Sequence, residues 1–266
     1  MVFRRMLGAL GVGGPSVDTV LLSPHTYPGG LVAGQVELTG GGQDVEIEHI
    51  ILGLVAGMET EGGEGAAAGE FHRTAVSGPL RLPAGRQLSV PFELELPWQA
   101  PITAVYGRPL HGLVMGVRTE VSIARAVDKG DLDPILVNPL PVQLRILDAF
   151  AELEFGFKGA DLERGRIAGV PRSLPFHQEI AYSAAPRYAH AVGEVELTFV
   201  TTPHAVEVIL EFDKRGGVLS GGPGGFGRFT VGHACADTTD WTRQVDAWVQ
   251  RTVEQRQGRG GFRDEG

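Results

Sequence analysis

The chain has 266 residues, 42% of them hydrophobic, so it can bury one large core or two of ordinary size, which argues against global disorder. Its 39 glycines and 17 prolines favour many strands joined by turns over a helical bundle. The formal charge of -9 argues against nucleic acid as the main partner, because phosphate binding needs clustered lysine and arginine. The single cysteine, Cys235, excludes an intrachain disulfide and a cysteine zinc site, and it predicts a reducing, cytoplasmic location.

Residues 1–13 combine an apolar side with a basic side and are predicted to form a short amphipathic helix. Packing on the chain's own domain is the favoured interpretation, because about two helical turns bind a membrane weakly without a second signal. The alternative is a peripheral membrane anchor at the inner face of the membrane, with the contact residues Phe3, Arg4, Arg5, Met6 and Leu7. No run approaches the ~20 apolar residues of a spanning helix, and no signal-peptide cleavage site follows, so a mature cytosolic N-terminus is expected.

Residues 14–126 are predicted to form a first β-sandwich. Runs of alternating apolar and polar residues are separated by turns rich in glycine and proline, which is typical of half-buried antiparallel strands. Pro91 lies inside one run and has no N–H to donate, so that strand is expected at a sheet edge or at a bulge. The expected strands span residues 17–22, 31–38, 45–55, 71–82, 88–96 and 113–123.

Residues 127–140 are predicted to be a joint between two domains, because aspartates, Gly130 and Pro134 disfavour both helix and strand interior. The spacing breaks the calcium-loop pattern, so an electrostatic latch across a domain interface is preferred to a calcium site, and a solvated turn stays open. The latch candidates are Arg118, Arg125, Asp128, Asp131, Asp133 and Arg145. In this hypothesis, Asp131→Ala changes partner binding more than stability.

Residues 141–236 are predicted to hold a helix, over 141–153, followed by a second β-sandwich with its cleanest strands at 194–200 and 206–212. Residues 237–256 are predicted to be a C-terminal amphipathic helix with a tryptophan and valine stripe, and 257–266 a disordered tail. Packing of the stripe on the second sandwich is favoured, since one amphipathic helix must bury its apolar side. The alternative is a partner contact through Trp241, Val245 and Trp248.

Catalytic and metal-binding motifs are missing from the sequence. No two of the eight histidines are spaced as a metal pair, and the glycine clusters lack the lysine of a phosphate loop. His233 lies two residues from Cys235, a spacing that can put both on one face of a strand without making a catalytic dyad, so a plain cysteine is favoured. There is no G-x-S-x-G elbow. The sequence therefore predicts a protein that is not an enzyme and that needs no cofactor and no metal.

Several stretches carry a family resemblance. GGPSVDTVL, VRTEVSIARAVDKGDLDP, VPRSLPFHQEI, ELTFV, VEVILEFDKRGG and GRFTVGH…DWTRQVDAWV resemble, in order and spacing, the bacterial sporulation-control (SpoOM-type) family. The resemblance implies two tandem arrestin-like β-sandwich domains with helical additions. It also implies a regulatory role in sporulation, development or cell division, with cell-division or cytoskeletal proteins as partners. It transfers no site residues. The prediction is thus an all-β, arrestin-like, cytoplasmic regulatory protein that binds protein partners, of unknown oligomeric state.

Overall fold

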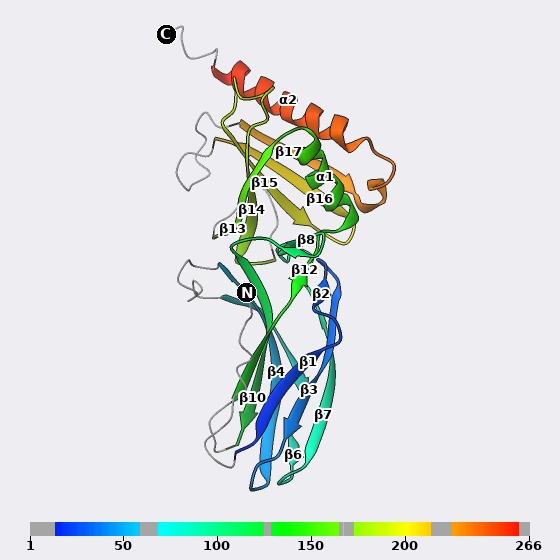
Figure 1. The fold of residues 1–266 in the computed structure, drawn as a ribbon, viewed down its shortest axis with the longest axis vertical. Coiled ribbons are helices and arrows are strands. Elements are labelled where there is room, and N and C mark those ends of the chain that lie inside the picture. Colours follow the sequence, from blue (N-terminus) through cyan, green and yellow to red (C-terminus); the bar gives the residue numbers. More distant parts are fainter. Residues whose placement is uncertain are drawn as a thin grey trace. The chain divides into compact units, whose positions relative to one another are not determined.

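A computed structural model describes residues 14–58, 69–124, 129–164, 167, 173–213 and 225–260 (Figure 1). The chain divides into two compact units. Unit 1 comprises Met1–Pro97 and Leu113–Asn138, and unit 2 comprises Trp98–Gly112 and Pro139–Gly266. Strands dominate both units over the described residues, and the helices belong to unit 2. The predicted all-β class, with two tandem β-rich units and added helices, is confirmed.

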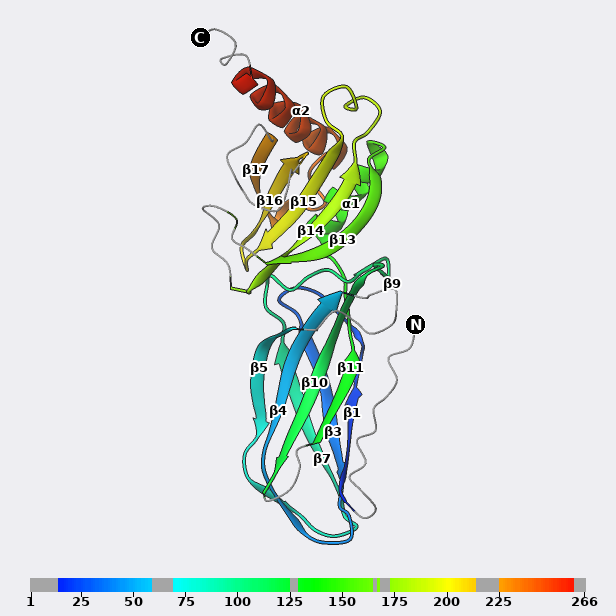
Figure 2. The same ribbon diagram turned by 90° about the vertical axis from the view of Figure 1, so that its left-hand side faces the viewer.

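Unit 1 contains two main sheets (Figure 2). The first has the order β1-β3-β7, with β1 (Ser16–Leu21), β3 (Leu31–Thr39) and β7 (Gln87–Glu95). The second has the order β11-β10-β4-β5, with β11 (Lys129–Pro134), β10 (Leu113–Ile123), β4 (Val45–Met58), β5 (Gly69–Ser77), and β6 (Leu80–Leu82) beside β4. A separate short pair joins β2 (His25–Thr26) to β12 (Leu136–Val137) in parallel.

The core of unit 1 follows from strand alternation. Every second residue of β3 and of most of β10 is buried, so each sheet turns one apolar face inward. Each fully buried valine or leucine contributes roughly 1.5–3 kcal/mol, so this face dominates the stability of the unit. Pro91 lies in β7, which pairs with β3 alone at the edge of its sheet, and this confirms the edge position expected for that proline.

Unit 2 contains one larger sheet of five antiparallel strands in sequence order. These are β13 (Gly156–Arg164), β14 (Phe176–Ser183), β15 (Glu194–Thr201), β16 (Ala205–Phe212) and β17 (Gly225–Gly232). The unit adds the hairpin β8 (Ala104–Val105) and β9 (Arg108–Pro109), the helices α1 (Pro141–Glu152) and α2 (Trp241–Gly260), and the 3-10 helix η1 (His233–Cys235).

Both helices pack on the same face of this sheet. The ring of Phe150 in α1 stacks on Tyr182 of β14, with centroids 4.8 Å apart, and Trp248 of α2 stacks on Phe229 of β17 at 4.9 Å. The strand register places Tyr182 and Phe229 on one face, since both lie opposite inward-facing residues of the strands between them. In the described part of unit 2, helices therefore cover the face that the expected second sandwich would have closed with another sheet.

Three of the predicted boundaries need correction. Residues 129–134 of the predicted joint form β11, because their backbone pairs with β10 and this outweighs the turn propensity of aspartate and glycine. Residues 98–112 belong to unit 2 and not to the first sandwich. The C-terminal helix runs to Gly260, into the segment predicted as a disordered tail. The predicted helix at 1–13 lies outside the described residues.

Candidate partner-binding site

The membrane-contact candidates cannot be placed. Phe3, Arg4, Arg5, Met6 and Leu7 lie outside the described residues. Over the part of the chain that the structure describes, no helix combines the length and the apolar character needed to cross a membrane. The peripheral anchor stays a prediction.

Asp131, one of the latch candidates, is buried inside unit 1. Its Oδ2 accepts a hydrogen bond from the backbone N–H of Thr19 at 2.9 Å, and its Oδ1 accepts one from the backbone N–H of Leu132 at 2.9 Å. The hydroxyl groups of Thr19 and Thr119 lie 2.6 Å apart beside it. Asp131 therefore joins β1 of one sheet to β11 of the other, which is a structural role different from the expected one.

The other latch candidates have varied surroundings. Arg145 forms an ion pair with Asp237 at 2.9 Å, and both residues belong to unit 2. Arg118 is exposed and Asp133 is half-buried. Arg125 and Asp128 lie outside the described residues. Neither Asp131 nor Arg145 supports a latch between domains, because the partners seen for each lie in its own unit, and the latch stays a prediction for the rest.

The apolar stripe of α2 packs within unit 2, in agreement with the favoured interpretation. Val245 is fully buried, and Trp248 is buried against Phe229. Partner contact is therefore corrected to core packing for Val245 and Trp248. Trp241 is buried as well, with its Nε1 donating to the carbonyl of Ala236 at 2.8 Å, but it lines a surface cleft.

This α1–α2 cleft is a polar concavity of unit 2. It has a volume of about 250 Å³ and is bounded by α1, by the segment after η1 and by the first turn of α2. Its functional groups come from Arg145, Asp148, Glu152, Asp237, Trp241 and Thr242. Arg145, Asp148 and Glu152 follow one another at helical spacing on α1, which puts them on one side of that helix.

Local interactions fix the two walls of the cleft. Gln143, in the first turn of α1, accepts a hydrogen bond from the backbone N–H of Leu140 at 2.8 Å and donates to Thr201 of β15 at 3.0 Å. Asp240 caps α2 by accepting from the backbone N–H of Arg243 at 3.1 Å. Both helices therefore start at defined points, and the residues of their facing turns have fixed positions.

The charges in the cleft are mainly negative. Asp148 accepts a hydrogen bond from the Tyr106 hydroxyl, and Glu152 accepts one from the Thr242 hydroxyl. The hydrogen bond to Asp148 raises the pKa of Tyr106, and the hydrogen bond to Asp237 raises the pKa of Arg145. Three carboxylates thus face one guanidinium, which leaves the cleft with a formal charge of about -2 from these groups.

Tyr106 holds an unusual position at the edge of the cleft. It lies at the tip of the β8–β9 hairpin with φ at 52°, followed by Gly107 at 71°, which is the two-residue turn with positive φ at both positions. Positive φ costs an ordinary residue roughly 1–2 kcal/mol. The ring is 68% exposed and is tied down by its hydroxyl, so an aromatic face is presented to solvent beside the carboxylate of Asp148.

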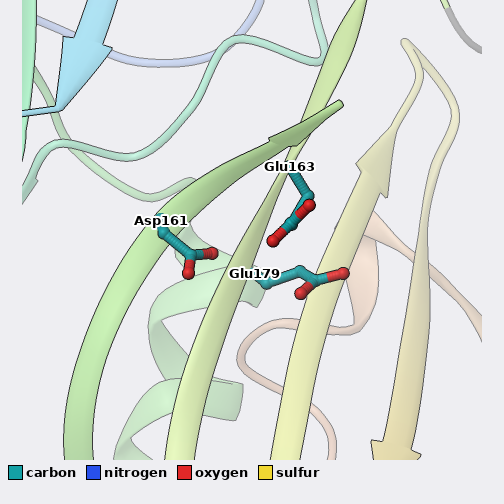
Figure 3. A group of neighbouring side chains, drawn as sticks. All are labelled: Asp161, Glu163 and Glu179. Atoms are coloured by element: carbon teal, nitrogen blue, oxygen red, sulfur yellow. The ribbon is translucent and has the colours of Figure 1, made fainter. Parts of the chain in front are cut away.

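A second polar group lies on the opposite face of the sheet. Asp161 and Glu163 of β13 and Glu179 of β14 bring one carboxylate oxygen each within 4.8 Å of the others (Figure 3). The Nε2 atom of His177 lies 2.9 Å from Glu179, and both side chains are nearly buried. Such carboxylates are the ligands that hard cations prefer. Asp161 and Glu179 each make a further interaction within the protein, so we do not assign this group as a metal site.

Sequence reasoning missed both groups. The residues at 161, 163, 177 and 179 alternate along neighbouring strands, so the patterns D-x-E and H-x-E could have revealed one polar face once those strands were paired. The cleft has no such local signal, because its two walls are separated by about ninety positions in the chain and meet only when α1 packs against α2.

Fold and site together define a class, a two-unit β-rich protein whose second unit carries its helices on one sheet face and a polar cleft between them. The family model described as SpoOM protein matches residues 3–216, so the chain belongs to the SpoOM protein family. It is 29% identical over 222 residues to the sporulation-control protein spo0M of Bacillus subtilis (strain 168). The aligned region covers 82% of this chain and 83% of that protein. The crystal structure of Spo0M, sporulation control protein, from Bacillus subtilis matches with a TM-score of 0.77 at 26% identity, over 92% of this chain and 100% of that chain. The resemblance found in the sequence is confirmed.

Proposed function

We propose that the protein is a cytoplasmic regulator of sporulation or of a related developmental programme, and that it acts by binding protein partners rather than by catalysis. The observation that carries this proposal is its likeness to a sporulation-control protein over both units, in sequence and in fold. A cytoplasmic location fits a chain whose one cysteine, Cys235, is free and half-buried.

The chemistry of the α1–α2 cleft supports binding over catalysis. The residues that line it include no serine, cysteine or histidine, and its acidic groups accept hydrogen bonds from Tyr106 and Thr242. The lining therefore lacks the serine–histidine and cysteine–histidine pairs that are common in covalent catalysis. Tryptophan and arginine, both present in the lining, are residue types that recur at the centres of protein interfaces.

Gene deletion in the source cell tests this proposal. A deletion strain and a strain complemented with the wild-type chain are compared for the frequency and timing of sporulation or of the corresponding developmental step. We expect the deletion to change this readout and the wild-type chain to restore it. A deletion strain that develops at the normal frequency and time contradicts the proposal.

A further inference from the structure

We infer that the α1–α2 cleft receives a lysine or arginine side chain from a basic segment of a partner protein. This inference rests on the proposed function, since it names the chemistry of the partner that the regulator binds. It commits to a cation because Asp148, Glu152 and Asp237 surround the cavity and Arg145 is the one cation among its lining residues.

The carboxylates are arranged to accept more than they already bind. Asp148 and Glu152 each receive one hydrogen bond from a neutral hydroxyl, from Tyr106 and Thr242 respectively. An ionised carboxylate has about four acceptor positions, so both groups keep capacity for an ammonium or guanidinium. A charge-assisted hydrogen bond is roughly twice as strong as a neutral one, so a cationic guest gains most from these positions.

The aromatic side chains of the cleft suit a cation as well. Trp241 lines the wall, and Tyr106, a largely exposed residue outside the lining, donates its hydroxyl hydrogen bond to Asp148 of the cleft. A guanidinium or ammonium over an exposed aromatic face gains about 0.5–1 kcal/mol in other proteins. Aromatic and acidic groups side by side therefore recognise the apolar stem and the charged head of one basic side chain.

An anionic guest fits this cleft poorly, although α2 begins there. Helix N-termini attract anions, but Asp240 already caps α2 by accepting from the backbone N–H of Arg243. Arg145 is engaged with Asp237 at 2.9 Å. A phosphate or carboxylate would have to displace that ion pair and approach Asp148 and Glu152, which carry the same sign of charge.

The size of the cavity points to a single side chain. Its volume of about 250 Å³ lies below the ~300–1,000 Å³ that is typical of pockets for whole small-molecule ligands. A lysine or arginine side chain enters such a space while the rest of the partner segment remains outside. We therefore expect the partner to present its basic residue on an exposed loop or terminus.

The test is a titration of the isotope-labelled full chain with a synthetic peptide in which three alanines separate two arginines. An otherwise identical peptide with glutamates in place of the arginines is the negative probe. Salt is kept near 0.15 M, where charges beyond about 8 Å are largely screened. The readout is the indole N–H signal of Trp241, and the signal of Trp98 serves as the internal control. The ring of Trp248 lies edge-on to that of Trp241, with centroids 6.3 Å apart, so its signal is not used as a control. We expect the arginine peptide to shift the Trp241 signal and the glutamate peptide to leave it unchanged.

Two pairs of substitutions make the test specific. The double variant Asp148→Asn with Glu152→Gln keeps the shape of the cleft and is expected to weaken binding at least about tenfold, because two charge-assisted contacts are lost. The matched control, Asp161→Asn with Glu163→Gln, removes the same formal charge from the other face of the sheet and is expected to change affinity less than about twofold. Thermal melting checks that both variants stay folded.

A third variant is expected to bind the arginine peptide more tightly and not more weakly. Arg145→Gln removes the cation that competes for Asp237, so we expect the arginine peptide to bind about threefold more tightly. Equal losses in both double variants, tighter binding of the glutamate peptide, or no shift of the Trp241 signal overturn the inference.

The outcomes separate this inference from the proposed function. If the deletion strain has a developmental defect and the Asp148→Asn, Glu152→Gln chain complements it fully, the role of the cleft is refuted while the regulatory function stands. If the deletion has no effect, the regulatory function is refuted, while the peptide titration still decides whether the cleft binds a basic side chain.

Discussion

The two units differ in where their polar side chains meet solvent. Unit 1 buries Thr19, Thr119 and Asp131 between two sheets, where they connect β1 to β11. Unit 2 also buries polar groups, among them Gln143 and Thr201, which share a hydrogen bond, but it forms in addition a polar cleft between α1 and α2 that is open to solvent. A buried polar group serves as a structural connection, whereas a polar cleft open to solvent is free to meet a partner.

The difference has its origin in what covers each sheet. In unit 1 a second sheet closes the core. In unit 2 the apolar faces of α1 and α2 do so through Phe150 and Trp248. Where α1 and α2 pack side by side, their exposed turns leave a cleft between them. Unit 2 is therefore where a concave site arises, and the predictions below test that division.

The largest effect is expected at the contact between α2 and the sheet. Trp248→Ala removes a buried ring that stacks on Phe229 and should lower the free energy of unfolding by about 3–5 kcal/mol. Chemical denaturation followed by far-UV circular dichroism measures the change. Arg243→Ala, on an exposed position of the same helix, serves as the control and should leave the midpoint nearly unchanged. Equal effects of the two substitutions would refute the packing role of the tryptophan.

The next effect concerns the buried connection in unit 1. Asp131→Ala leaves the backbone N–H of Thr19 without its acceptor and should cost about 1–3 kcal/mol. Asp131→Asn keeps one oxygen and should recover part of that stability. Hydrogen exchange resolved by peptide should place the loss in β1 and β11. If instead the stability is unchanged and peptide binding falls, the latch hypothesis returns for this residue.

A pH effect is expected at the end of α2. Burial alone raises the pKa of Asp213, but hydrogen bonds from Arg256 and from the backbone N–H groups of Glu194 and Gly193 outweigh it, so the pKa is lowered overall. A lowered pKa in the folded state adds stability above the unfolded value near 3.8, and that stability is lost as the pH falls through the folded pKa.

The variant Asp213→Asn should therefore be less stable than the wild type near neutral pH. The two chains should converge below the folded pKa, where the wild-type carboxyl is protonated. Urea denaturation across this range measures the difference. A gap that persists unchanged in strong acid would show that the effect is not electrostatic.

The smallest effect is expected at the exposed ion pair of the cleft. Arg145 and Asp237 are largely in solvent, and such pairs contribute little to stability. Arg145→Gln should leave the thermal midpoint within error of the wild type, although it should strengthen binding of the arginine peptide. A marked drop in the midpoint would assign the pair to the structure of unit 2 and not to recognition.

Much of the fold could be predicted from alternation, and the failures have particular causes. The alternating runs around Leu94 and Val208 predict strands, and the structure has strands there, because one face of each is buried. The run from Lys129 to Pro134 predicts a joint because aspartate and glycine have low strand propensity. Pairing with β10 and burial of Asp131 overrode that propensity, and neither is visible locally.

The candidate site was less predictable than the fold. The stripe that contains Trp241 and Trp248 indicated a buried helix face, but it did not indicate what lies beside it. Asp148 and Glu152 are ordinary acidic residues on the outer side of a predicted helix until α2 packs against α1. A site built by two helices that are distant in sequence depends on tertiary packing, which no local pattern encodes.

The most direct test of the central claim is complementation of the deletion strain with the cleft variant. The chain with Asp148→Asn and Glu152→Gln is expressed at the wild-type level, beside the matched chain with Asp161→Asn and Glu163→Gln, and sporulation or the corresponding developmental step is scored. We predict that the cleft variant fails to restore normal development and that the matched control restores it. Full restoration by a folded cleft variant would contradict the claim that unit 2 recognises its partner through this cleft.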